Sequence, residues 1–287
     1  MIGPIVIFAA IFVALQVAPI TLLLLIMLWD SQHSIMQQHG FGRIYDFKAG
    51  SGSPRTPRFD LCLHWILFGN MFLNAPLFVT MWLRALYRLN LTIPVNAIRT
   101  LQLVCWTVTA VYLVIYLVHV IRSVQRGYPI NPMKYLFIAA SYFLWYYVAW
   151  NTNSILLYAV AHRIMHGVQY IVMVYAFMDR TARQPDKKPG FWKRIAGPGH
   201  LRWFLVGGAA YAVLFQLLIN HPLDEFGFGV VNFAPYPAIP QFNLPALGFD
   251  ASYALFSQMM VYSYGMMHYY LDSFIWKVRD KQVQAGL

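Results

Sequence analysis

Long apolar runs separated by short polar connections make up almost the whole chain. About seven of these runs have, or approach, the ~20 residues that a helix needs to cross the hydrocarbon core of a bilayer. They predict helices over residues 3–35, 59–87, 95–123, 133–151, 154–178, 202–220 and 251–277. The pattern therefore predicts an all-α fold, a polytopic integral membrane bundle of about seven transmembrane helices in a single domain over residues 1–287.

The composition supports lipid as the solvent of this chain. Apolar residues fill 59% of the positions and charged residues only 11%, whereas an ordinary soluble domain has roughly 25% charged residues. The net charge of +11 would by itself fit a nucleic-acid partner. However, most Lys and Arg residues lie in connections between apolar runs, where they favour contacts with lipid headgroups. We therefore expect membrane lipid as a partner and no nucleic acid.

The connections differ in charge, and this difference predicts the topology. Four segments are basic and are expected in the cytoplasm by the positive-inside rule: residues 40–58, 122–134 including Lys134, 179–200 and the C-terminus. The proline-rich loop 221–250 carries only acidic charges and is expected on the opposite side. The N-terminus is therefore expected outside and the C-terminus inside, in a bacterial inner membrane. Arg84 and Arg88, near the outer end of the second helix, argue against this topology.

Two histidines on the fifth predicted helix are the main functional signal. Ionisable residues inside membrane helices are costly and usually mark functional sites. His162 and His166 are one turn apart on an otherwise apolar helix, so they share a face. Two imidazoles at this spacing can bind the same metal ion or adjacent ions. The pair therefore predicts a metal site.

Three more histidines share a helical face with a carboxylate: His33 with Asp30, His64 with Asp60 and His268 with Asp272. A carboxylate can hold the second ring N–H of a ligating histidine and fix its tautomer. All five histidines are expected in the inner half or middle of the membrane. The predicted ligands are His33, His64, His162, His166 and His268, with Asp30, Gln37, Asp60, Gln169 and Asp272 expected to orient them.

Other polar residues are expected to have ordinary structural roles. His119 lies beside Arg122 and is expected to be structural. His39 is placed in a loop, and even a helix continuing to residue 39 would rotate it away from His33. Asn70 and Asn74 share a face of the second helix, where hydrogen bonds to a neighbouring helix are expected. The aromatic residues of 133–151 favour an interfacial belt over a slot for a flat apolar substrate.

Histidine ligands with few carboxylates and no thiolates suit iron, copper or zinc. A substrate that enters from lipid offers unactivated C–H or polyene bonds, which acid–base catalysis cannot attack. An open-shell metal that activates dioxygen can attack them. We therefore expect a non-haem iron oxygenase or dioxygenase acting on a lipophilic small molecule, while zinc hydrolysis with Asp60 or Asp272 as base is a weaker alternative.

The chain resembles the Brp/Blh β-carotene dioxygenase family. The resemblance rests on the multi-helix scaffold, a histidine near the end of the first helix, another on an early helix and a late His-x-x-x-His pair. It implies an iron enzyme that cleaves a carotenoid in the membrane. Carried over to this sequence, it implies His33, His64, His162 and His166 as iron ligands.

Two other function classes remain open from the sequence. Histidines on different helices could hold a haem in an electron-transfer protein, although two axial ligands would leave the one-turn spacing of His162 and His166 unexplained. A proton-coupled transporter could use the His/Asp pairs as a relay. A retinal-binding opsin is disfavoured because the last helix has no lysine before Lys277.

Overall fold

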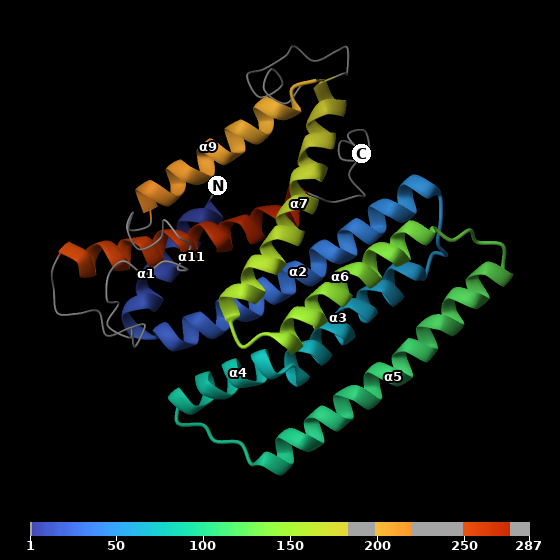
Figure 1. Ribbon diagram of the computed structural model, residues 1–287, viewed down its shortest axis with the longest axis horizontal. Helices are drawn as coiled ribbons and strands as arrows, with labels where there is room; N and C mark the ends of the chain where they lie inside the picture. The colour runs from blue at the N-terminus through green and yellow to red at the C-terminus, as the bar shows by residue number, and fades with distance from the viewer. Residues whose placement is uncertain (1, 183–198, 220–248, 276–287) are drawn as a thin grey trace. The chain divides into compact units, whose positions relative to one another are not determined.

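The computed structural model describes residues 2–182, 199–219 and 249–275, and most of these residues are helical (Figure 1). The helices are α1 Ile2–Val17, α2 Pro19–Ala49, α3 Thr56–Asn74, α4 Pro76–Arg88, α5 Val95–Gln125, α6 Pro132–Asn151, α7 Ile155–Ala182, α9 Leu201–Ile219 and α11 Phe249–Ile275. The all-α prediction is confirmed for these residues. Most of the predicted loops 179–200 and 221–250 lie outside them.

Two predicted helices are broken at prolines. The helix expected over 3–35 divides between α1 and α2 at Pro19, which has no N–H to donate to the preceding turn. The helix expected over 59–87 divides into α3 and α4, whose axes differ by 71°. Ala75 between them has an extended backbone, as favoured for a residue that precedes a proline. The second apolar run is therefore a bent pair.

The helix α2 extends well beyond the predicted end at residue 35. It continues through the expected connection and ends at Ala49, followed by Gly50 with a positive φ of 59°, a common way to end a helix. The extra turns are polar in sequence but packed in the structure, since Gln38 and Asp46 are buried. Hydropathy marks the end of the apolar run, whereas packing extends the helix and makes His39 helical.

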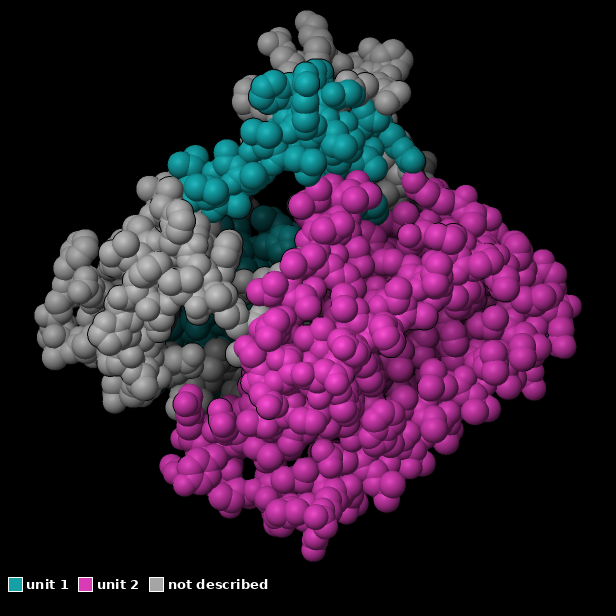
Figure 2. All heavy atoms as spheres, viewed as in Figure 1, with its two compact units in different colours: residues 1–26, 173–287 teal, residues 27–172 magenta. Residues whose placement is uncertain are grey.

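The chain divides into two compact units, drawn in teal and magenta in Figure 2. Unit 1 contains residues 1–26 and 173–287, and unit 2 contains residues 27–172. Within unit 1, side chains of α1, α2 and α11 form a small apolar cluster of Ile11, Leu15, Leu22 and Met266. The absence of a side chain at Gly3 lets the Tyr270 ring approach, since a Cβ there would lie 2.6 Å from it. The expectation of a single domain stays a prediction.

Helices of unit 2 alternate in direction along the chain. Asn70 pairs with Thr109 and Asp60 with Tyr116, so α3 and α5 are antiparallel. The same argument makes α3 parallel to α6, because Asp60 contacts Lys134 and His64 contacts Tyr142. Contacts of α2 with α6 run in the opposite order, as Tyr45 with Asn131 and Phe41 with Phe137. Unit 2 is therefore an up-and-down bundle (Figure 1).

Two connections expected in the cytoplasm lie at the same end of unit 2. The backbone N–H of Gly52, in the connection after α2, donates to the carbonyl of Pro129, in the connection after α5, at 2.9 Å. The core between the helices contains Ile35, Met71 and Trp145, all almost completely buried. Asn70 donates to Thr109 across the α3–α5 contact, at 3.0 Å, which confirms its expected interhelical hydrogen bond.

Fewer helices meet the criteria for a membrane span than the seven expected. Of the described helices, α5 alone is long and apolar enough to cross a bilayer, and α3 with α4 qualifies only as a bent pair. The described apolar parts of α1 and α9 are short. α2 becomes polar after Trp29, and tyrosine, tryptophan and histidine lower the hydropathy of α6 and α7. The seven-span arrangement is therefore not supported by helix length and composition.

Candidate metal centre

The part of α2 that lies in unit 2 meets α7 along a buried polar face. Ser34 Oγ lies 3.0 Å from His162 Nε2, and the Gln38 amide donates to Gln169 Oε1 at 3.1 Å. These contacts follow the same order along both helices, so α2 and α7 run in the same direction here. His33, which is 6% exposed, belongs to this face. The contact brings together residues more than a hundred positions apart in the sequence.

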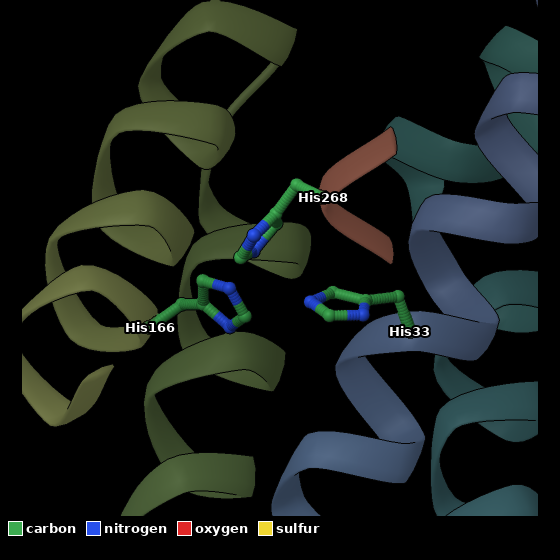
Figure 3. Close-up of side chains that lie close together, drawn as sticks. All are labelled: His33, His166 and His268. Atoms are coloured by element: carbon green, nitrogen blue, oxygen red, sulfur yellow. The ribbon is translucent and has the colours of Figure 1, made fainter. Parts of the chain in front are cut away.

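His33 and His166 form the histidine pair best placed to share a metal ion. Their ring centroids are 5.4 Å apart and their planes differ by 69°, and Figure 3 shows the two side chains extending toward each other from α2 and α7. Two imidazoles on one ion have centroids roughly 4.5–6.4 Å apart, given metal–nitrogen bonds of about 2 Å. One nitrogen of each ring lies within 4.8 Å of the other, and two nitrogens bound to one ion lie at most about 4.2 Å apart, given bonds of about 2 Å.

His162 and His166 are in contact but do not converge on one point. Their rings are stacked, with centroids 5.8 Å apart and planes only 14° apart. A metal ion lies in the plane of each imidazole that binds it, and stacked parallel rings share no such position. Metal ligation by His162 stays a prediction, and in this arrangement it would involve a different ion from the one bound by His166.

The hydrogen bonds of Ser34 define the tautomer of His162. The Ser34 hydroxyl donates to the Asp30 carbonyl at 2.9 Å. Because a hydroxyl has a single proton, its oxygen must accept the hydrogen bond from His162 Nε2–H. The Nε2 atom of His162 is therefore a donor, and only Nδ1 is suited to hold a metal.

Aromatic side chains surround His162. The Trp145 ring lies 5.3 Å away and the Tyr158 ring 5.8 Å away, both measured between centroids. Trp145 and Tyr158 are buried, and within the described residues Trp145 Nε1 and the Tyr158 hydroxyl have no hydrogen-bond partner. The aromatic run of α6 thus presents Trp145 to the histidines, while Phe143 and Tyr147 of the same helix are exposed.

Several of the residues expected to orient the histidine ligands form hydrogen bonds with other partners or have none among the described residues. Gln169 accepts from Gln38, a residue that the sequence did not single out. The Gln37 amide is buried and has no hydrogen-bond partner within the described residues. Asp30 contributes its backbone carbonyl to Ser34. An i, i+4 pattern identifies which residues share a helical face but not which partner each one takes from another helix.

His64 lies away from the His33/His166 pair and contacts His39. The His39 and His64 rings have centroids 6.2 Å apart. His39 follows His33 by six residues, which is roughly 9 Å along α2. Three rings connect the two locations, each in contact with the next: Tyr142, Trp145 and His162. Because a metal–nitrogen bond is only about 2 Å long, His64 cannot bind the same ion as His33 in this arrangement.

Asp60 orients a lysine rather than His64, contrary to the sequence-based expectation. Lys134 Nζ donates to Asp46 Oδ2 and to Asp60 Oδ2, at 2.9 Å in each case, and the Tyr116 hydroxyl donates to Asp60 Oδ1 at 2.7 Å. All three charged residues are buried. Lys134 is therefore held inside unit 2 by two carboxylates, and its expected location on the cytoplasmic side stays a prediction. Asp46, the one acidic residue in an otherwise basic connection, was the signal that could have revealed this cluster.

His268 belongs to unit 1 and is also labelled in Figure 3. Its Nε2 lies 3.4 Å from Asp272 Oδ2, so the predicted i, i+4 contact between imidazole and carboxylate is confirmed. Such a contact orients an imidazole and favours one tautomer. Metal ligation by His268 stays a prediction.

Comparisons with known proteins identified no relative of this chain. No family model, curated protein or solved structure matches this chain. The resemblance to the Brp/Blh β-carotene dioxygenase family therefore stays a prediction.

Proposed function

We propose that this chain is a polytopic membrane metalloprotein in which His33 and His166 bind an iron ion that activates dioxygen for the oxidation of a lipophilic substrate. The contact of the two buried rings, with centroids 5.4 Å apart, is the observation that carries the proposal. Its two members come from helices distant in sequence, so their proximity is not a consequence of helical spacing. Imidazole is a common ligand of iron, copper and zinc.

Membrane insertion is supported by the surface of unit 2. Only 11% of the most apolar stretch of α5 is buried, and its exposed side chains include Leu103, Val114 and Leu117. Exposed apolar surface on this scale is rare in soluble monomers. The alternating directions of the unit 2 helices, with two basic connections at one end, fit a chain with its N-terminus outside and its C-terminus inside a bacterial inner membrane.

The surroundings of His33 and His166 suit oxidation chemistry in several ways. Two imidazoles leave coordination positions open for dioxygen and for further ligands. Buried aromatic side chains, including Trp145, exclude water from the neighbouring His162. Bound iron would activate dioxygen, and the protein would hold the ion and provide an apolar surface for the substrate. A carotenoid is the lipophilic substrate suggested by the family resemblance.

Elemental measurement on protein purified in mild detergent, without a histidine tag or chelator, tests the proposal. We expect near-stoichiometric iron and no Soret band. His33→Ala and His166→Ala should each remove the iron while leaving the helical circular dichroism unchanged. His119→Ala is the matched control, because His119 stacks on Phe59 and contacts Thr56 instead of another histidine.

Four outcomes would contradict the proposal. A Soret band would indicate a haem protein, and wild-type protein without metal would favour a transporter. Stoichiometric copper or zinc in place of iron would refute the iron assignment. Iron that is retained in both His33→Ala and His166→Ala would show that these residues are not the ligands.

A further inference from the structure

A second pair of histidines lies outside the site proposed above. His39 on α2 and His64 on α3 have ring centroids 6.2 Å apart and planes inclined by 76°. His64 is completely buried. No pattern in the sequence combines these residues, because His39 was expected in a loop. The continuation of α2 to Ala49 places His39 on a packed helix.

The tautomer of His64 follows from its contact with Tyr142. The Tyr142 hydroxyl donates to the backbone carbonyl of His64 at 3.0 Å, and its oxygen lies 3.1 Å from His64 Nδ1. The single hydroxyl proton is used by the carbonyl, so Nδ1 must be protonated and donates to the Tyr142 oxygen. In the neutral imidazole, Nε2 then carries the lone pair, which is the arrangement found in a metal-binding histidine.

Each histidine has a buried nitrogen that lacks a hydrogen bond. Within the residues that the structure describes, His64 Nε2 and His39 Nδ1 have no hydrogen-bond partner. Buried polar atoms are nearly always satisfied, so two such atoms on neighbouring rings point to a shared ligand.

We propose that His39 and His64 form a second metal site, separate from that of His33 and His166, which binds copper(I). Imidazole ligands suit copper, zinc and iron, but copper(I) alone among these is stable with two ligands in a linear arrangement. Two imidazoles on opposite sides of one ion would have ring centroids roughly 6.3 Å apart, given metal–nitrogen bonds of about 2 Å. The observed separation is 6.2 Å.

The proposed site has an orienting side chain of its own. Tyr142 holds the Nδ1–H of His64 in the way that a carboxylate or carbonyl holds a ligating histidine in known metal sites. The acidic side chains of the neighbourhood are engaged elsewhere, since Asp46 and Asp60 both bind Lys134. The site therefore has imidazole ligands without carboxylates, which disfavours magnesium and calcium.

Copper(I) titration of the full chain in detergent tests this inference. The protein competes for the ion, under anaerobic conditions, with a chromophoric copper(I) chelator. Wild-type protein should bind one equivalent more than His39→Ala or His64→Ala. His39→Ala is the more informative of the two, because His64→Ala also removes the contact with Tyr142 and is more prone to misfold. His119→Ala should bind as much copper as the wild type.

The same titration of His166→Ala separates this inference from the proposed function. The copper equivalent that depends on His39 should remain in His166→Ala, even if that variant has lost its iron. Equal copper binding by wild type and a folded His39→Ala would overturn the second site while leaving the first intact. Loss of that equivalent in His166→Ala or His119→Ala would also overturn it, because the copper would then not be held by His39 and His64 alone.

Discussion

Replacing Lys134 by methionine should be among the most destabilising single changes in unit 2. The amine forms hydrogen bonds of 2.9 Å to both Asp46 and Asp60, and its side chain is only 1% exposed. Each charge-assisted hydrogen bond contributes about 1.5–3 kcal/mol. Methionine fills a similar volume but leaves two buried carboxylates without their shared cation. Removing one partner of a buried ion pair costs about 3–5 kcal/mol, and we expect a loss of that size.

Unfolding in mixed micelles with increasing denaturing detergent, followed by circular dichroism, measures the change. Arg126→Met is the matched control, since Arg126 is exposed at the same end of unit 2, and it should change the free energy of unfolding by less than about 0.5 kcal/mol. The triple variant with Asp46→Asn and Asp60→Asn should recover part of the loss, because no uncompensated charge remains. A loss below about 1 kcal/mol for Lys134→Met would refute the buried cluster.

Two further predictions test individual contacts. Tyr116→Phe removes the hydroxyl that donates to Asp60 and should lower the free energy of unfolding by about 1.5–3 kcal/mol, measured in the same unfolding assay, whereas an unchanged value would contradict the contact. His162→Ala should retain iron that His166→Ala loses, because the His162 ring is stacked parallel to His166 and bonded to Ser34; equal loss of iron in the two variants would show that both ligate one ion.

Apolar runs predicted the helices well, since α5, α6 and α7 begin and end within a few residues of the expected limits. The differences arise where the limits of an apolar run do not coincide with the limits of a helix. Proline splits a continuous run, as at Pro19 and Pro76, because its missing N–H interrupts the hydrogen bonding of the helix. Buried polar contacts extend a helix past the end of its run, as for α2, where Asp46 binds Lys134.

The candidate ligands were harder to predict than the helices, for a geometric reason. Spacing along one helix places His162 and His166 on one face, but it does not fix the orientation of their rings, which are stacked in the structure. The contacts of His33 with His166 and of His39 with His64 depend on the registers of separate helices, which no local pattern contains. A one-turn histidine pair is therefore evidence for a polar face on α7. The histidine that His166 contacts depends on the register of α2 against α7, and the contact of His39 with His64 depends on the register of α2 against α3.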